Sequence, residues 1–68
     1  MIIQLNGEPK ELNDGITVEA LINQQMQTTS AQGIAIAVNG HVVRRTQWET
    51  TSLVPNDDVE ILQAVAGG

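Results

Sequence analysis

The chain has 68 residues, a formal net charge of −5 and no cysteine. This length allows one domain with one small core and leaves little room for a deep substrate pocket. The lack of cysteine excludes disulfides, thiolate metal sites and thiol nucleophiles. Three basic residues against eight acidic ones argue against nucleic acid as a partner, because phosphate neutralisation needs clustered lysine and arginine.

The sequence carries no sign of a membrane segment or an export signal. No apolar run approaches the roughly 18 residues that a membrane-spanning helix needs, and Met1-Ile2-Ile3 lacks the basic region of a signal peptide. We therefore expect a cytoplasmic protein. Its acidic balance favours a partner with a basic surface, because complementary potentials speed encounter.

The first third of the chain predicts a hairpin and then a helix. Residues 2–5 form a short strand, Asn6-Gly7 is a strong signal for a type I′ turn, and residues 8–12 form the return strand. Pro9 cannot donate to a ladder, so the return strand should lie at a sheet edge.

The helix is expected over residues 18–26 and is followed by a surface loop. Thr17 is the expected N-cap and Glu19 lies in the first turn, where the helix dipole favours an acid. Leu21 and Ile22 belong to an apolar stripe at helical spacing. Polar residues then predict a loop up to Gly33.

Three strands are expected in the second half. Residues 34–38 alternate large apolar residues with Ala35 and Ala37, which should face away from the core. Asn39-Gly40 predicts a second hairpin, whose partner strand begins with residues 41–43. Residues 59–63 form the last strand.

The residues between these strands have ordinary structural interpretations. Trp48, the only aromatic residue, is expected to be an anchor half-buried against the sheet. His41 has no companion ligands and is expected at the surface rather than at a metal site. Asp57-Asp58 is expected to be a solvated turn. Arg44-Arg45 either pairs with acids of the domain or meets a partner.

The element order β-β-α-β-β-β indicates an α+β fold, in which a mixed sheet packs across one main helix. The first and last strands would lie side by side and parallel. The last strand would then run from the sheet centre into the tail. We expect a folded domain over residues 1–63 and a flexible tail over residues 64–68.

The tail ends in Gly67-Gly68, preceded by Val65 and Ala66. Glycine has no side chain and allows close approach to other surfaces, so such a terminus can enter a narrow active site of another protein. The Gly68 carboxylate is the predicted site of chemistry, because no nucleophile, base and orienting group can be assembled elsewhere.

A docking surface is predicted beside the tail. Glu60 and Leu62 should point away from the helix, and Ala35 and Ala37 should share that outer face. A small apolar patch formed by Leu62, Ala37 and Ala35 would suit an activating enzyme.

The whole chain resembles the ThiS family of sulfur carriers, which are ubiquitin-like β-grasp proteins. The resemblance lies in the tail at 63–68, the segment at 38–43, the Arg45-Thr46-Gln47-Trp48 stretch and the turn at 55–58. There are two departures, since the family often has proline at the position of Arg44 and an Asp-Gly-Asp turn in place of Asn56-Asp57-Asp58. Asn tolerates the left-handed conformation that such a turn needs.

The resemblance implies a carrier that is not itself an enzyme. An E1-like activating enzyme (ThiF-like) would use ATP to adenylate Gly68, and a sulfur donor would displace AMP to leave a thiocarboxylate. A thiazole synthase (ThiG-like) would accept the sulfur for thiamine biosynthesis. No permanently bound cofactor is expected, because ATP belongs to the activating enzyme.

Three alternatives stay open on the sequence. The first is a small subunit of molybdopterin synthase (MoaD-like), which shares fold, tail and chemistry, although the 45–48 stretch favours ThiS. The second is a ubiquitin-like protein modifier. The third is a plain interaction domain whose terminal glycines have no role.

Overall fold

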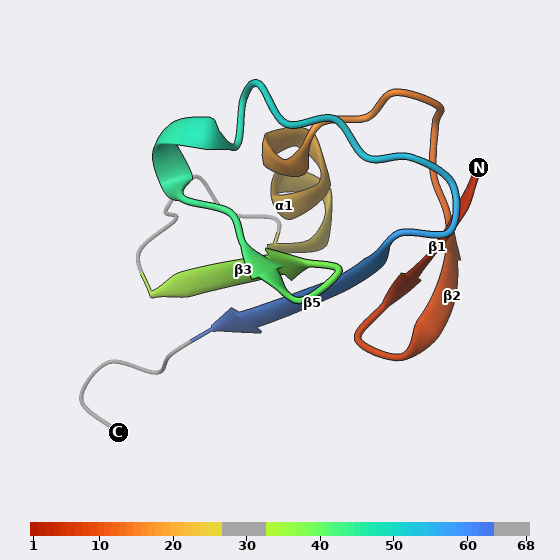
Figure 1. The fold of residues 1–68 in the computed structure, drawn as a ribbon, viewed down its shortest axis with the longest axis horizontal. Coiled ribbons are helices and arrows are strands. Elements are labelled where there is room, and N and C mark those ends of the chain that lie inside the picture. The colour runs from red at the N-terminus through yellow and green to blue at the C-terminus, as the bar shows by residue number, and fades with distance from the viewer. Residues whose placement is uncertain (27–32, 64–68) are drawn as a thin grey trace.

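The structure is a computed structural model and describes residues 1–26 and 33–63, with only the backbone described at Met26. Within these described ranges, five strands, one helix and one 3-10 turn follow one another (Figure 1). They are β1 (Ile2–Leu5), β2 (Glu8–Glu11), α1 (Val18–Met26), β3 (Ile34–Val38), β4 (His41–Val42), η1 (Arg45–Gln47) and β5 (Asp58–Gln63). The predicted order of strands and helix is confirmed. The predicted loop at 27–32 and the predicted tail at 64–68 lie outside the described residues.

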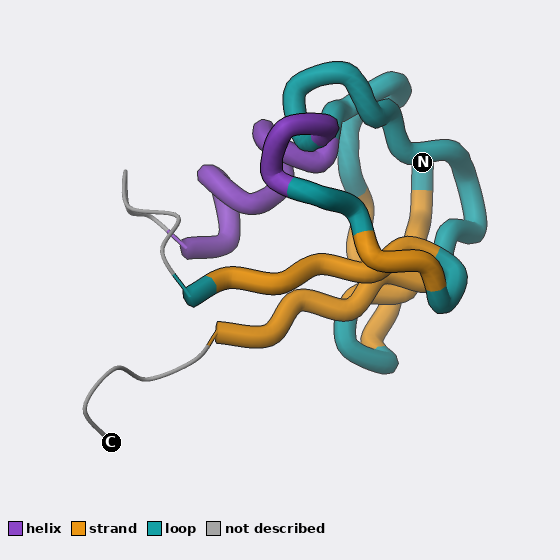
Figure 2. Tube along the Cα trace, turned by 60° about the vertical axis from the view of Figure 1, so that its left-hand side comes forward, coloured by secondary structure: helices purple, strands orange, loops and turns teal. Residues whose placement is uncertain are grey.

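The strands form one mixed sheet in the order β2-β1-β5-β3-β4. β5 lies parallel to β1, with Leu5 opposite Val59, whereas it runs antiparallel to β3, with Ile36 opposite Ile61. The last strand is therefore central, as expected. α1 packs on one side of the sheet and leaves the other side open (Figure 2).

Both Asn-Gly pairs form the predicted hairpin turns. Asn6 and Gly7 have φ values of 50° and 84°, and Asn39 and Gly40 have φ values of 53° and 82°. Two successive positive φ values define the type I′ turn, whose twist matches that of the flanking strands. Asn56 also has a positive φ, 71°, which confirms that asparagine keeps the left-handed position of its turn.

The start of α1 is capped from two parts of the chain. The Thr17 Oγ1 accepts the Ala20 N–H at 3.2 Å, which confirms the predicted N-cap. Val18 N–H donates to the Thr51 carbonyl at 2.8 Å, and Glu19 N–H donates to the Trp48 carbonyl at 3.0 Å. The segment that follows η1 thus satisfies the amides that a helix start leaves open.

Among the described residues, ten buried apolar side chains form one core between α1 and the sheet. They are Ile3, Leu12, Val18, Leu21, Ile22, Ile36, Trp48, Leu53, Val59 and Ile61. Each large one contributes roughly 1.5–3 kcal/mol when fully buried. Trp48 is only 5% exposed, so its side chain is more deeply buried than the half-buried anchor that the sequence predicts. Its Nε1 donates to the Val43 carbonyl at 2.9 Å, which satisfies the indole N–H and lets the ring go fully inside.

The strand ends differ by one residue from the sequence expectation. β2 stops at Glu11 rather than at residue 12, although Leu12 N–H still donates to the Met1 carbonyl at 2.8 Å and the Leu12 side chain is buried in the core. β5 begins at Asp58, which pairs with Gln4. Pro9 lies on β2 at the sheet edge, as predicted, where its missing N–H breaks no interior ladder.

Candidate functional site

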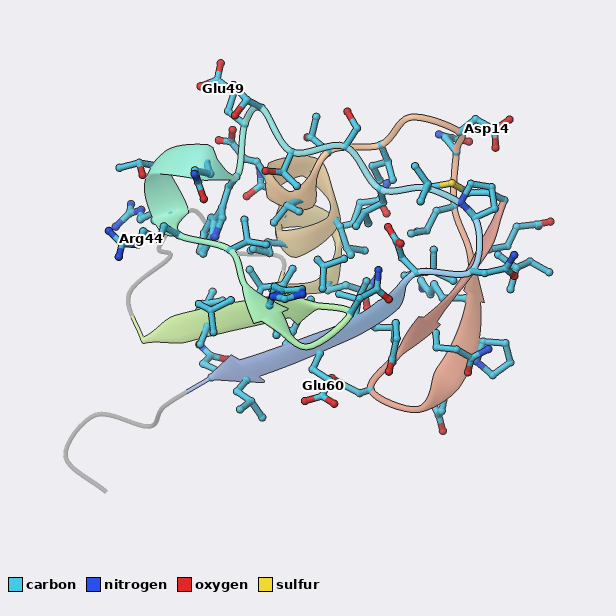
Figure 3. All side chains as sticks on the ribbon, in the orientation of Figure 1. Asp14, Arg44, Glu49 and Glu60 are labelled. Atoms are coloured by element: carbon cyan, nitrogen blue, oxygen red, sulfur yellow. The ribbon has the colours of Figure 1, made fainter. Side chains whose placement is uncertain are left out.

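β5 is the strand that leads into the predicted tail, and its side chains alternate between the two faces of the sheet. Val59 and Ile61 are buried against the helix side, whereas Glu60 and Leu62 are exposed. Leu62 is 68% exposed. Figure 3 shows Glu60 pointing away from the side of the sheet that carries α1. The predicted orientation of this strand is therefore confirmed.

The structure brings the predicted patch residues together on the open face of the sheet. Ala35 lies directly opposite Leu62 on β5, and Ala37 lies opposite Glu60. Ala35 is exposed and Ala37 is half-buried. Cross-strand partners point to the same face, so these side chains form one continuous surface.

Val42 belongs to the same surface, although the sequence analysis did not include it. It pairs with Ala37 and is 73% exposed. The two-residue turn at Asn39-Gly40 fixes the register of β3 and β4, so the sequence held the information to place it. We call Leu62, Ala35, Ala37 and Val42 the outer-face patch.

Asn6 supports the exit strand from the β1–β2 turn. Its Oδ1 accepts the Ile61 N–H at 2.9 Å, and its Nδ2 donates to the Ile61 carbonyl at 3.3 Å. The backbone N–H of Asn6 also donates to the Val59 carbonyl at 2.9 Å. The side-chain amide thus continues the β1–β5 ladder beyond the end of β1.

A second asparagine supports the start of β5. The Asn39 Oδ1 accepts the Asp58 N–H at 2.9 Å, and its Nδ2 donates to the Asp57 carboxylate at 2.9 Å. The same carboxylate accepts the Val54 N–H at 2.9 Å. Asp57 is 7% exposed, so the expected solvated turn is wrong for this residue. A buried carboxylate needs such donors, and here they fix the turn before β5.

The remaining singled-out side chains lie at the surface. His41 is exposed, as expected. Arg44 and Arg45 are exposed at the start of η1, and Figure 3 shows Arg44 at the end of the molecule where β5 finishes. Neither guanidinium forms an ion pair with any residue of 1–26 or 33–63, where the ion pair present joins the Met1 ammonium to Asp14 at 3.2 Å.

The described residues line two shallow hollows among those on the surface of the domain. The larger, about 470 Å³, lies near the N-terminus and is lined by Met1, Glu11, Leu12, Asn13, Asp14 and Gln24. The smaller, about 280 Å³, lies on the helix side near the end of β5 and is lined by Leu5, Asn6, Gln25, Ile61 and Gln63. The lining residues of either hollow include no nucleophile paired with a base, so neither resembles an active site.

Among the residues that the structure describes, no group of three or more His, Asp or Glu side chains could hold a metal ion. In the same part of the chain, no helix is long and apolar enough to cross a membrane. The site residues Gly68, Gly67, Ala66 and Val65 lie outside the described residues. The described part of the candidate site is therefore β5 with the outer-face patch beside it.

Comparison with known proteins identifies a matching family model and a relative that carries the same family name. The ThiS family model matches residues 3–68. The chain is 32% identical over 68 residues to the sulfur carrier protein ThiS of Escherichia coli (strain K12), and the alignment covers both chains completely.

Solved structures of thiamine biosynthesis proteins have the same fold as this chain. The crystal structure of the thiamine biosynthesis protein ThiS from Geobacter metallireducens superposes with a TM-score of 0.80 at 26% identity, over the full length of both chains. A solution structure of a thiamine biosynthesis protein from the same organism gives a TM-score of 0.78 at 26% identity, over the whole of this chain and 88% of that one. The fold is accordingly the ubiquitin-like β-grasp. With the family match over nearly the whole chain, the central exit strand and the open sheet face beside it, this chain belongs to the ThiS family.

Proposed function

We propose that the chain is a sulfur carrier of thiamine biosynthesis whose reacting group is the Gly68 carboxylate. The observation that carries the proposal is the family match through residue 68, together with a central strand that leads into the Gly67-Gly68 end. The Escherichia coli relative, which the alignment covers completely, is named as a sulfur carrier. The domain would present its tail and would perform no catalysis itself.

The chemistry begins with a poor electrophile. A carboxylate resists attack because its carbon already carries two electron-rich oxygens. In the proposed first step, a Gly68 carboxylate oxygen attacks the α-phosphorus of ATP and pyrophosphate leaves. The acyl-adenylate then has a good leaving group, and a sulfur nucleophile displaces AMP, which takes one carboxyl oxygen with it. Covalent activation thus divides one difficult step into two easier ones.

Glycine suits the reacting position for steric reasons. It has no β-carbon beside the carboxyl carbon, so the nucleophile and a narrow enzyme channel can both approach. The lack of cysteine in the chain also fits, because a carrier thiol would compete for the sulfur by exchange. No bound cofactor is needed, because ATP is a substrate of the activating enzyme.

The proposed partners are an E1-like (ThiF-like) activating enzyme, a sulfur donor and a ThiG-like thiazole synthase. The outer-face patch, centred on Leu62, would dock the activating enzyme. Its exposed side chains Leu62, Ala35 and Val42 lie on the strand that leads to the tail and on the next two strands of the sheet, β3 and β4. The dependence on ATP supports the cytoplasm as the place of action.

The test is an intact-mass measurement. The protein is incubated with the activating enzyme of its own organism, ATP and a sulfur source, and exchange of one oxygen for one sulfur at the C-terminus is expected. A variant that lacks Gly68 should keep the far-UV circular dichroism of the parent and lose the exchange. A parent protein that stays unmodified under these conditions would contradict the proposal. Adding the thiazole synthase with its other substrates should then return the mass to that of the carboxylate.

A further inference from the structure

We propose that Arg44 and Arg45 form a contact with an acidic surface of the activating enzyme, next to the place where the tail enters it. This inference rests on the proposed function. It concerns two of the three basic residues in a chain with eight acidic ones, so their position is not explained by a generally basic surface.

The backbone that carries the two arginines is held firmly. Val43 N–H donates to the Ile36 carbonyl at 2.9 Å, and the Val43 carbonyl accepts the Trp48 Nε1 at 2.9 Å. Within η1, Gln47 N–H donates to the Arg44 carbonyl at 2.8 Å, and Trp48 N–H donates to the Arg45 carbonyl at 3.2 Å. Two long cationic side chains thus extend from a fixed turn.

The side chains of the arginines have no structural task that the described residues reveal. Arg44 stands at the N-cap position of η1 without a side-chain capping bond, and both residues are exposed. Within residues 1–26 and 33–63, neither guanidinium pairs with a carboxylate. Of the two sequence interpretations, pairing with acids of the domain and meeting a partner, the second fits these contacts better.

Strand register places the arginines at the end of the domain where β5 stops. Val38 pairs with His41 and Ala37 with Val42, and the Val43 bond to Ile36 continues the same antiparallel path. After β4, the chain therefore runs back alongside β3 toward Ile34, the first residue of β3. Ile34 pairs with Gln63 at the end of β5. Figure 3 agrees, because Arg44 lies at the end of the molecule where β5 stops.

A protein interface of typical size, centred on β5, would extend far enough to reach the end of the sheet where Arg44 lies. A stable interface covers about 800 Å² per partner, which corresponds to a radius of about 16 Å. Neighbouring strands lie about 4.8 Å apart, so β4 lies about 10 Å from β5. The chain that follows β4 then rises from the sheet on the side that carries α1 (Figures 1 and 2). Arg44 lies on the α1 side of β3 (Figure 3), so an enzyme that covers the outer-face patch meets Arg44 only if it also reaches around the end of the sheet where β5 stops. The overall acidic balance of the chain favours a basic surface elsewhere on the enzyme, whereas this local basic pair fits acidic side chains at the rim, where charges chiefly set the encounter rate and orientation.

The experiment measures activation kinetics with charge-reversed variants. Arg44→Glu and Arg45→Glu are compared with Lys10→Glu, which makes the same change in net charge on β2 at the opposite edge of the sheet. The rate of pyrophosphate release by the activating enzyme of the same organism is followed against carrier concentration. Circular dichroism verifies that every variant is folded.

We expect the KM for the carrier to rise about tenfold for each arginine variant at low salt, with less than about a twofold change for Lys10→Glu. The difference should shrink as ionic strength rises, because exposed charges are screened. Arginine variants that match Lys10→Glu, or a difference that salt leaves unchanged, would overturn this inference while leaving the carrier role intact. A wild-type protein that the enzyme fails to activate would instead contradict the proposed function.

Discussion

Asn6 binds Ile61 in the way that a strand residue would, with one hydrogen bond accepted and one donated by its side-chain amide. The two residues are 55 positions apart in the sequence. Asn6 also holds a positive φ of 50° in its turn. One residue therefore closes the first hairpin and lengthens the pairing of the exit strand.

Replacing Asn6 with glycine should separate these two roles. Glycine adopts the positive φ without strain, so only the side-chain bonds to Ile61 are lost. We expect a loss of about 1–2 kcal/mol in the free energy of unfolding, measured by urea denaturation. Asn39→Gly is an informative companion, because it removes the corresponding bonds at the start of β5. An Asn6→Gly variant as stable as the parent would show that the amide bonds add nothing net.

Asp57→Ala should be far more damaging than Asp58→Ala. The Asp57 carboxylate is buried and accepts bonds from Val54 N–H and Asn39, which the alanine variant would leave without a partner. The expected loss is about 2–3 kcal/mol. Asp58 is exposed, and its bond to Asn39 uses the backbone, so its side chain should matter by less than about 0.5 kcal/mol. Equal stability of the two variants in thermal unfolding would contradict this assignment.

Trp48→Phe should destabilise the domain and loosen the start of α1. Phenylalanine keeps an aromatic ring in the core but has no N–H for the Val43 carbonyl. We expect a cost of about 1–3 kcal/mol, because that buried acceptor loses its partner and the smaller ring leaves space. Circular dichroism at increasing temperature measures the change. Since the parent has no other aromatic residue, its tryptophan emission offers an independent record of unfolding.

Leu62→Glu should leave folding unchanged and slow activation. The side chain is 68% exposed, so its replacement removes no core contact, whereas a buried charge within an apolar interface is costly. We expect the KM for the carrier to rise at least about tenfold in the pyrophosphate-release assay. Val54→Glu is the matched control, since Val54 is 56% exposed and precedes the start of β5. If both variants are activated like the parent, the outer-face patch is not the docking surface.

Local sequence signals were sufficient for most of the fold. Each Asn-Gly pair fixed a two-residue turn, Thr17 fixed the start of α1, and Pro9 identified an edge strand. Alternation within β5 and β3 placed Leu62 and Ala35 on one face. These features depend on neighbours within a few positions, so a single sequence contains them.

Contacts between distant segments could not be obtained in the same way. The bonds of Asn6 to Ile61 and of Asn39 to Asp57 depend on how strands meet after folding. Sequence alone could not show that an aspartate in a turn would be buried, because one of its two donors, Asn39, comes from a different turn. The depth of Trp48 likewise depends on a carbonyl at Val43 that becomes available only where β4 ends.

The place of β5 has a mechanical consequence. A partner that pulls on the tail would load β5 along its length, and the strand is hydrogen-bonded to β1 on one side and to β3 on the other. Force applied along a strand is shared by many ladder bonds at once, whereas an edge strand peeled sideways would lose them one after another. The Asn6 side chain adds to this shared resistance near the end of the strand. Pulling on the C-terminal end of β5 would therefore load the bonds to β1 and to β3 together.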